Sequence, residues 1–197
     1  MTDADLPILR VHFRPDPRRP YIRRARGSGP DGALFLKRYD LSAWSGTSAW
    51  RDRVEARCRL VERVTGGLTR FRLDGEVLIR ISRPAAGLTD TGRDRAISPA
   101  AVAALTRTLE AAHAAGLWHG DVTRRNVIAG ESGADLFDWE PILVAPGPAP
   151  ATDPAPDRVT DPTRWLGGCD LIGLVEPGAP VADLDLIGLR LIAEGRA

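Results

Sequence analysis

The residues whose types could do chemistry gather in two short segments of the second half of the chain. His119-Gly120-Asp121 is followed by Asn126, the only asparagine in the sequence, and Asp138 follows the apolar pair Leu136-Phe137. A carboxylate can accept the proton of a hydroxyl group, and carboxylate and amide oxygens are the hard ligands that Mg²⁺ prefers. The pattern therefore predicts Asp121 as a general base, and Asp138 with Asn126 as a metal site.

A third candidate is Lys37, the only lysine among 27 basic residues. An ammonium group is a compact point charge, whereas a guanidinium group is a wide planar fork. A single lysine in an arginine-rich chain thus indicates a position where a guanidinium group is unsuitable and a compact cation is needed. We expect Lys37 to hold an anionic group such as a phosphate.

The composition excludes several classes of protein. The 197 residues carry 27 basic and 26 acidic side chains, for a net charge of +1, and 43% of them are apolar. This balance is unlike that of a basic nucleic-acid coat or a disordered chain. Cys58 and Cys169 lie outside any CxxC spacing, which indicates neither a metal site nor a disulfide framework. Residues 1–13 lack the long apolar run of a signal peptide, and no membrane span is recognised, so we expect a cytoplasmic protein.

The first part of the chain is predicted to form mainly strands. Residues 8–14 alternate apolar and polar side chains, and an amphipathic helix is expected from Ser48 to a stop at Gly66-Gly67. Around these features we predict further strands at 21–26, 33–37, 68–73 and 76–81, with turns at 15–20, 27–32 and 74–75.

Beyond residue 82 the pattern changes from strands to helices. Ser98-Pro99 opens a helix that stops at Gly116, and a final amphipathic helix is predicted over residues 181–194. Between them we expect a short hairpin, 127–129 with 134–137, and a proline-rich run, 145–162, that would not fold alone.

This order of parts resembles the protein-kinase-like superfamily, whose catalytic loop reads H-x-D-x-x-x-x-N and whose metal-binding aspartate follows the next short strand. The form with Gly120 in place of arginine is similar to the aminoglycoside and choline kinases, the lipopolysaccharide (Kdo-type) kinases and the small Bud-type kinases. The resemblance implies an α+β fold with two lobes. Residues 1–82 would form an N-lobe with a five-stranded antiparallel sheet and one helix, and residues 83–197 a minimal, mostly helical C-lobe.

The resemblance also implies ATP and Mg²⁺ as cofactors. Lys37 would contact the α and β phosphates, and a glutamate of the helix that begins at Ser48 would pair with it. Glu55 fits the family's spacing, and Glu62 is the alternative. In the last helix an aspartate would anchor the catalytic loop, and either Asp183 or Asp185 fits that position.

The sequence departs from the family at the glycine-rich phosphate loop. The turn between the first two strands contains no glycine, and the glycines at 27, 29 and 32 stand too close to Lys37 to form that loop. We expect Arg18 or Arg19 to hold phosphates in its place, and Arg125 to contact phosphate or an acidic acceptor. The seven arginines of residues 10–26 are interpreted as a solvated strand face and not as a nucleic-acid site.

Two functions follow from this reading. The first is an ATP-dependent phosphotransferase whose acceptor is a hydroxyl group of a protein serine or threonine, or of a sugar or other small molecule. The second is a pseudokinase that binds a nucleotide or a partner. Because the chain stops near the last expected helix, we also expect a protein partner or a second copy to cover the truncated C-lobe.

Overall fold

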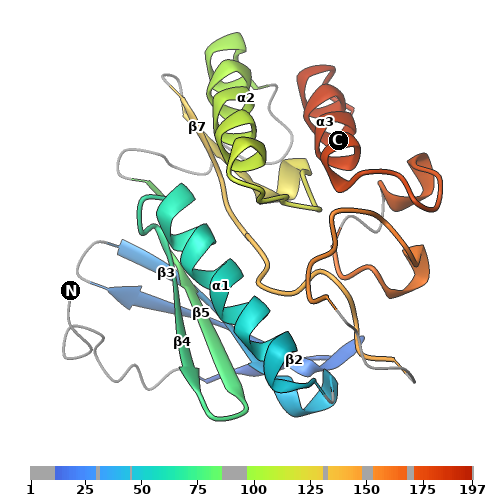
Figure 1. Cartoon of the computed structure of the whole chain (residues 1–197). Helices are drawn as coiled ribbons and strands as arrows, with labels where there is room; N and C mark the ends of the chain where they lie inside the picture. The colour runs from blue at the N-terminus through green and yellow to red at the C-terminus, as the bar shows by residue number, and fades with distance from the viewer. Residues whose placement is uncertain are drawn as a thin grey trace.

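The computed structural model describes residues 12–29, 32–44, 46–85, 97–130, 133–147, 153–167 and 171–196. The chain has an α+β fold, in which an antiparallel sheet and one helix lie on one side and two further helices on the other (Figure 1). The segment that follows the short hairpin of strands β6 (Val127–Ala129) and β7 (Ala134–Leu136) runs between the two sides.

The sheet has five strands in the order β1-β2-β3-β5-β4, and all neighbouring strands are antiparallel. The strands span Arg14–Asp16 (β1), Arg19–Gly29 (β2), Gly32–Asp40 (β3), Thr69–Asp74 (β4) and Val77–Ser82 (β5). The antiparallel five-stranded sheet that the sequence pattern indicates is confirmed.

Helix α1, Ser48–Val64, packs against this sheet. Thr47 caps it, since its hydroxyl accepts a hydrogen bond from the backbone N–H of Trp50 at 3.2 Å. Its apolar face, which includes Trp50 and Val54, joins Tyr39 and Leu78 of the sheet in one buried cluster. The helix ends where Gly66 and Gly67 take positive φ angles of 58° and 79°.

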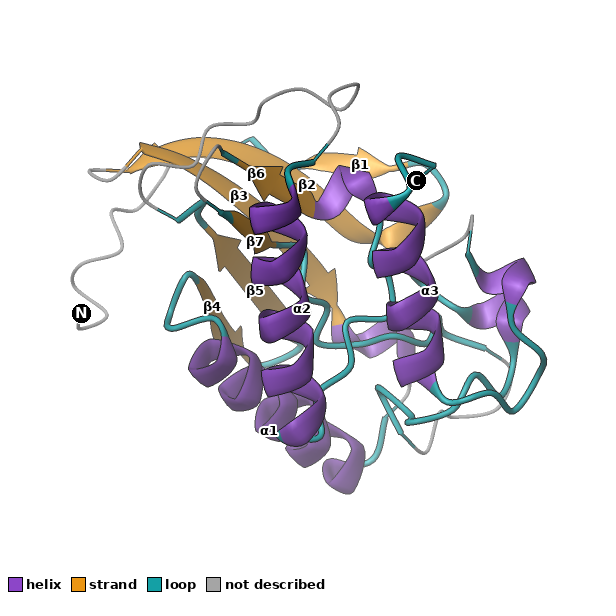
Figure 2. Cartoon of the chain, turned by 90° about the horizontal axis from the view of Figure 1, so that it is seen from above, coloured by secondary structure: helices purple, strands orange, loops and turns teal. Residues whose placement is uncertain are grey.

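The second side is built from helices α2, Pro99–Ala114, and α3, Val181–Ala193, with the hairpin of β6, Val127–Ala129, and β7, Ala134–Leu136. Helix α2 starts as predicted, because Ser98 accepts from the backbone N–H of Ala101 at 3.1 Å. Leu105 and Leu109 of α2 share a buried cluster with Leu189 of α3. Figure 2 shows α2 and α3 side by side above α1. Short 3-10 helices occur at Leu41–Trp44, Arg124–Asn126, Pro162–Arg164 and Ile172–Leu174.

The first hairpin differs from the prediction. Of the expected strand 8–14, residues 8–11 lie outside the described part of the chain, and the described strand starts at Arg14. The expected turn at 15–20 is narrower, because Pro15 pairs with Arg23 and Asp16 with Arg19. Proline is tolerated there because β1 is an edge strand. The expected turn at 27–32 is also shorter, since β2 and β3 continue to a Gly29–Gly32 pair.

No described helix combines the length and the apolar character needed to cross a membrane. The described part of the proline-rich segment is held by the rest of the second side: the backbone N–H of Leu143 donates to the carbonyl of Pro154 at 2.7 Å, and Val159 is fully buried.

Candidate functional site

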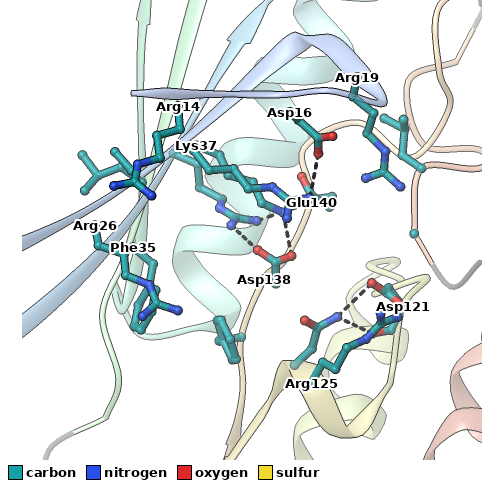
Figure 3. A pocket seen from close by; sticks show the side chains of 18 of the residues that line it. Arg14, Asp16, Arg19, Arg26, Phe35, Lys37, Asp121, Arg125, Asp138 and Glu140 are labelled. Atoms are coloured by element: carbon teal, nitrogen blue, oxygen red, sulfur yellow. Dashed lines mark hydrogen bonds and ion pairs between the residues drawn. The ribbon is translucent and has the colours of Figure 1, made fainter. Parts of the chain in front are cut away.

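One cavity of about 960 Å³ lies between the sheet and the second side of the molecule. Its lining includes Lys37 from β3, Asp121 and Asn126 from the loop after α2, and Asp138 after β7. Figure 3 shows these parts of the chain facing one another. The structure therefore brings together four residues that are separated by up to about a hundred positions in the sequence.

The hairpin of β6 and β7 positions Asn126 beside Asp138. Val127 pairs with Leu136, and the backbone N–H of Phe137 donates to the carbonyl of Asn126 at 2.9 Å. Residues at the open end of an antiparallel pair lie side by side, so Asn126 and Asp138 reach the same cavity. The number of residues between Asn126 and Asp138 in the sequence is thus set by the length of this hairpin.

Lys37 is buried, with only 7% of the residue exposed. Its ammonium group donates to Asp138 Oδ2 at 2.6 Å and also to Glu140 Oε1. The second oxygen of Glu140 accepts from the hydroxyl of Tyr39. Burial and the neighbouring Glu140 raise the pKa of Tyr39 well above its usual value, so this phenol stays protonated and keeps donating.

The prediction that a glutamate of α1 pairs with Lys37 is wrong. Glu55 lies on the exposed side of the helix and pairs with Arg59 at 3.4 Å, while Glu62 accepts from the backbone N–H of Phe71 at 2.8 Å. The helix is turned so that its buried face carries Trp50, Val54, Arg57, Cys58 and Val61. Lys37 instead takes its acidic partners from the segment after β7.

Arg57 is the charged residue that α1 contributes near the site. Its guanidinium group donates to the backbone carbonyl of Glu140 at 3.0 Å and to that of Trp118 at 2.6 Å. Burial lowers the pKa of Arg57 to about 10. Its position three residues after Val54, on the apolar face of the helix, was the sequence signal that could have identified it.

Arg80 of β5 is a second residue that the sequence analysis missed. It is 1% exposed, and it donates to Asp138 Oδ1 and to the backbone carbonyl of Trp139, the latter at 3.1 Å. Burial alone would lower the pKa of Arg80, but Asp138 and the other facing groups raise it above its usual value. Buried and partly exposed residues alternate along β5, and Leu78 and Arg80 both lie on its buried side. An arginine at a position that the alternation predicts to be buried was the signal that could have identified it.

Asp138 stays ionised between these two cations. Burial by itself would raise its pKa, but the positive charges of Arg80 and Lys37 outweigh this and hold the pKa well below the usual range. Its backbone has a positive φ of 70°, the only such value among described residues other than glycine. The left-handed conformation turns the chain so that Asp138 and Glu140 both reach Lys37.

Asp121 is held by Asn126, whose amide nitrogen donates to the carbonyl oxygen of Asp121 at 2.8 Å and to its Oδ2 at 2.9 Å. The other oxygen, Oδ1, is buried and has no hydrogen-bond partner among the described residues. A side chain at Gly167 would lie 2.7 Å from the Cβ of Asp121, so glycine is needed there. The loop thus fixes a carboxylate with one acceptor atom unused.

Asp185 of α3 anchors this loop. Its carboxylate accepts from the backbone N–H groups of His119 at 2.8 Å and Gly120 at 2.7 Å, and it lies 3.0 Å from His113 Nε2. Asp183 is exposed two residues earlier on the helix. Residues two apart point in different directions on a helix, so only one of them can face the loop, and the structure selects Asp185.

The turn between β1 and β2 brings arginines to the cavity. Arg18 and Arg19 line it, as expected from the sequence, and Figure 3 shows Arg19 reaching down on the side of Asp121. Arg125 lies beside Asp121 at the opposite wall. In all, eight arginine or lysine side chains line the cavity against four acidic ones. The lining has a net positive charge that suits an anionic ligand.

The donors at the site fit Mg²⁺ in type. Asp138 offers a carboxylate, and the amide oxygen of Asn126 is the donor left after its nitrogen bonds Asp121. Among the described residues no group of three or more histidine, cysteine or carboxylate side chains is arranged to hold a metal ion. Further oxygens from a ligand or from water would therefore complete the coordination.

Comparison with family models found no match to this chain, and no curated protein matches it significantly.

Proposed function

We propose that this protein is an ATP-dependent phosphotransferase with a two-lobed, kinase-like arrangement, which moves the γ-phosphoryl group to a hydroxyl acceptor. The observation that carries the proposal is the meeting of Lys37, Asp121, Asn126 and Asp138 in one cavity. Phosphoryl transfer requires positioned reactants and compensated charge more than covalent chemistry on the protein. These four residues supply a cation, a base and two oxygen donors.

Asp121 accepts the proton of the attacking hydroxyl group in this proposal. Its carboxylate has acceptor capacity left for that proton, since Oδ2 accepts from Asn126 while Oδ1 has no hydrogen-bond partner among the described residues. Asn126 and the backbone anchored by Asp185 keep the carboxylate in place while the hydroxyl group approaches. A base held by two supports loses little entropy when the acceptor binds.

Lys37 binds the phosphates of the nucleotide. Its ammonium group has three protons, and Glu140 continues to hold it when the contact with Asp138 is exchanged for a phosphate oxygen. Asp138 and Asn126 would hold Mg²⁺, which supplies charge neutralisation on the phosphate oxygens. The arginines of the β1–β2 hairpin add positive charge where protein-kinase-like enzymes place a glycine-rich loop.

Turnover of γ-labelled ATP, with and without candidate acceptors, tests this proposal. Asp121→Asn should reduce turnover about a hundredfold or more, while stabilisation by Mg-nucleotide in a thermal-shift assay remains. Asp52→Asn, at an exposed position on α1, is the matched control and should behave as the wild type. Absence of turnover together with an unchanged melting temperature on addition of Mg-ATP would refute the proposal.

A second candidate is a nucleotide-binding pseudokinase. It is favoured by the pairing of Asp138, because one carboxylate oxygen contacts Lys37 and the other contacts Arg80. A site closed in this way can bind phosphates through cations alone. Nucleotide-dependent stabilisation that is the same with and without Mg²⁺, with no phosphoryl transfer to any acceptor, would favour this candidate over the enzyme.

A further inference from the structure

Four charged side chains form a compact inner cluster at the centre of the cavity. Lys37 contacts Asp138 and Glu140, and Arg80 contacts the same two carboxylates, with 3.4 Å between its Nη1 and Glu140 Oε1. The cluster holds two positive and two negative charges, so it is neutral. No uncompensated negative charge remains in it to attract a free divalent cation.

The two contacts of Asp138 differ in how easily they can be exchanged. Arg80 is 1% exposed and is fixed at two further points, the carbonyl of Trp139 and the carboxylate of Glu140. Removing a buried guanidinium group from this environment would leave two buried carboxylates poorly compensated, which is costly. Lys37 is also buried, but it can release Asp138 and still keep Glu140.

Arg80 and Lys37 are held at this spacing by the sheet itself. They are paired residues of the neighbouring strands β3 and β5, so their side chains leave the same face of the sheet side by side. The relation between the two cations therefore does not depend on a ligand.

We propose that Arg80 is a positioning residue that closes Asp138 to free divalent cations, so that a metal ion enters this site only together with nucleotide phosphates. The phosphates attract Lys37 away from Asp138 and expose Oδ2, while Arg80 keeps Oδ1 and the orientation of the carboxylate. Asp138 then contacts the metal through one oxygen only. This inference rests on the proposed function for the identity of the nucleotide, but the closure by Arg80 is a property of the protein alone.

Mn²⁺ binding, measured as the loss of the electron paramagnetic resonance signal of the hydrated ion, tests the proposal without any activity measurement. The wild-type protein should bind Mn²⁺ weakly when alone and at least about tenfold more tightly with a non-hydrolysable ATP analogue. Arg80→Met should bind Mn²⁺ without nucleotide about tenfold or more tightly than the wild type, since it leaves two carboxylates to one ammonium group.

Two variants serve as controls. Arg80→Lys retains the positive charge and should still exclude free Mn²⁺, and Arg72→Met removes an exposed arginine from the neighbouring strand β4 and should match the wild type. Circular dichroism establishes that each variant is folded. If Arg80→Met does not fold, the wild-type comparison with and without nucleotide, each corrected for Mn²⁺ bound by the analogue without protein, still tests whether the metal ion enters only with the nucleotide.

Equal Mn²⁺ affinity of the wild-type protein with and without the nucleotide analogue, when the analogue itself binds, would overturn the proposal. Equal affinity of the wild type and folded Arg80→Met for Mn²⁺ alone would do the same. Failure of the proposed function looks different: no nucleotide binds under any condition, while the difference between wild type and Arg80→Met in Mn²⁺ binding persists.

Discussion

Replacing Asp185 tests whether α3 holds the loop that carries Asp121. The carboxylate is fully buried and accepts hydrogen bonds from two backbone N–H groups, those of His119 and Gly120. Asp185→Ala leaves both N–H groups buried without this acceptor. Asp185→Asn keeps one oxygen acceptor but turns an amide NH₂ group toward the other donor.

The magnitude follows from these two bonds. A buried donor left without a partner costs about 1–3 kcal/mol, so Asp185→Ala should lower the free energy of unfolding by about 2–6 kcal/mol and Asp185→Asn by roughly half as much. In a protein of this size 1 kcal/mol corresponds to about 2–4 °C, so the melting temperature should fall by about 4–24 °C for the alanine variant. Gly120 precedes Asp121, so the proposed phosphoryl transfer should fall by more than the loss of stability explains.

Urea denaturation followed by tryptophan fluorescence measures the free energy of unfolding. Asp183→Asn is the matched control, because Asp183 lies on the same helix, is exposed, and was the alternative anchor from the sequence. We expect it to change stability by less than about 0.5 kcal/mol. If Asp183→Asn destabilises the protein as much as Asp185→Asn, or if Asp185→Ala is neutral, the assignment of the anchor is wrong.

Two further predictions concern packing and burial. Gly188→Ala would place a Cβ atom 2.1 Å from the carbonyl oxygen of Val122, so it should lower stability in urea by about 1–3 kcal/mol or more, whereas Gly173→Ala, which meets no atom within 4 Å, should stay within about 0.5 kcal/mol. Burial raises the pKa of the Cys58 thiol to about 12, so in a Cys169→Ser background iodoacetamide should label the folded protein at pH 9 far more slowly than the urea-unfolded chain; equal rates would contradict this.

The secondary structure could be predicted well because its signals are local. Thr47 and Ser98 cap α1 and α2 through atoms three residues away, and the glycine pair after α1 supplies the positive φ angles that end the helix. The prediction of the first hairpin was less accurate. Pro15 was interpreted as a turn residue, but it lies in β1, because an edge strand can accommodate proline. Whether a strand lies at an edge depends on the whole sheet.

Part of the candidate site could also be predicted from the sequence. Asp121 and Asn126 are five residues apart and bond each other directly, so their spacing reports a real contact. The single lysine and the aspartate after β7 were identified by residue type and order, and both line the cavity. What these residues bind and what reaction they perform stays a prediction.

The sequence by itself determined which helices and strands form and where the charged residues stand along them, because capping, alternation and helical periodicity act over a few positions. The tertiary structure alone decided the partners: Lys37 meets Glu140 across 103 positions, Arg80 meets Asp138 across 58, and Asp185 reaches Gly120 across 65. A buried charge is stabilised by whichever opposite charge the packing places within about 3 Å, and helix rotation and strand order, not local spacing, set that choice. Glu55 fits the spacing expected of a partner for Lys37, but the rotation of α1 points it to solvent.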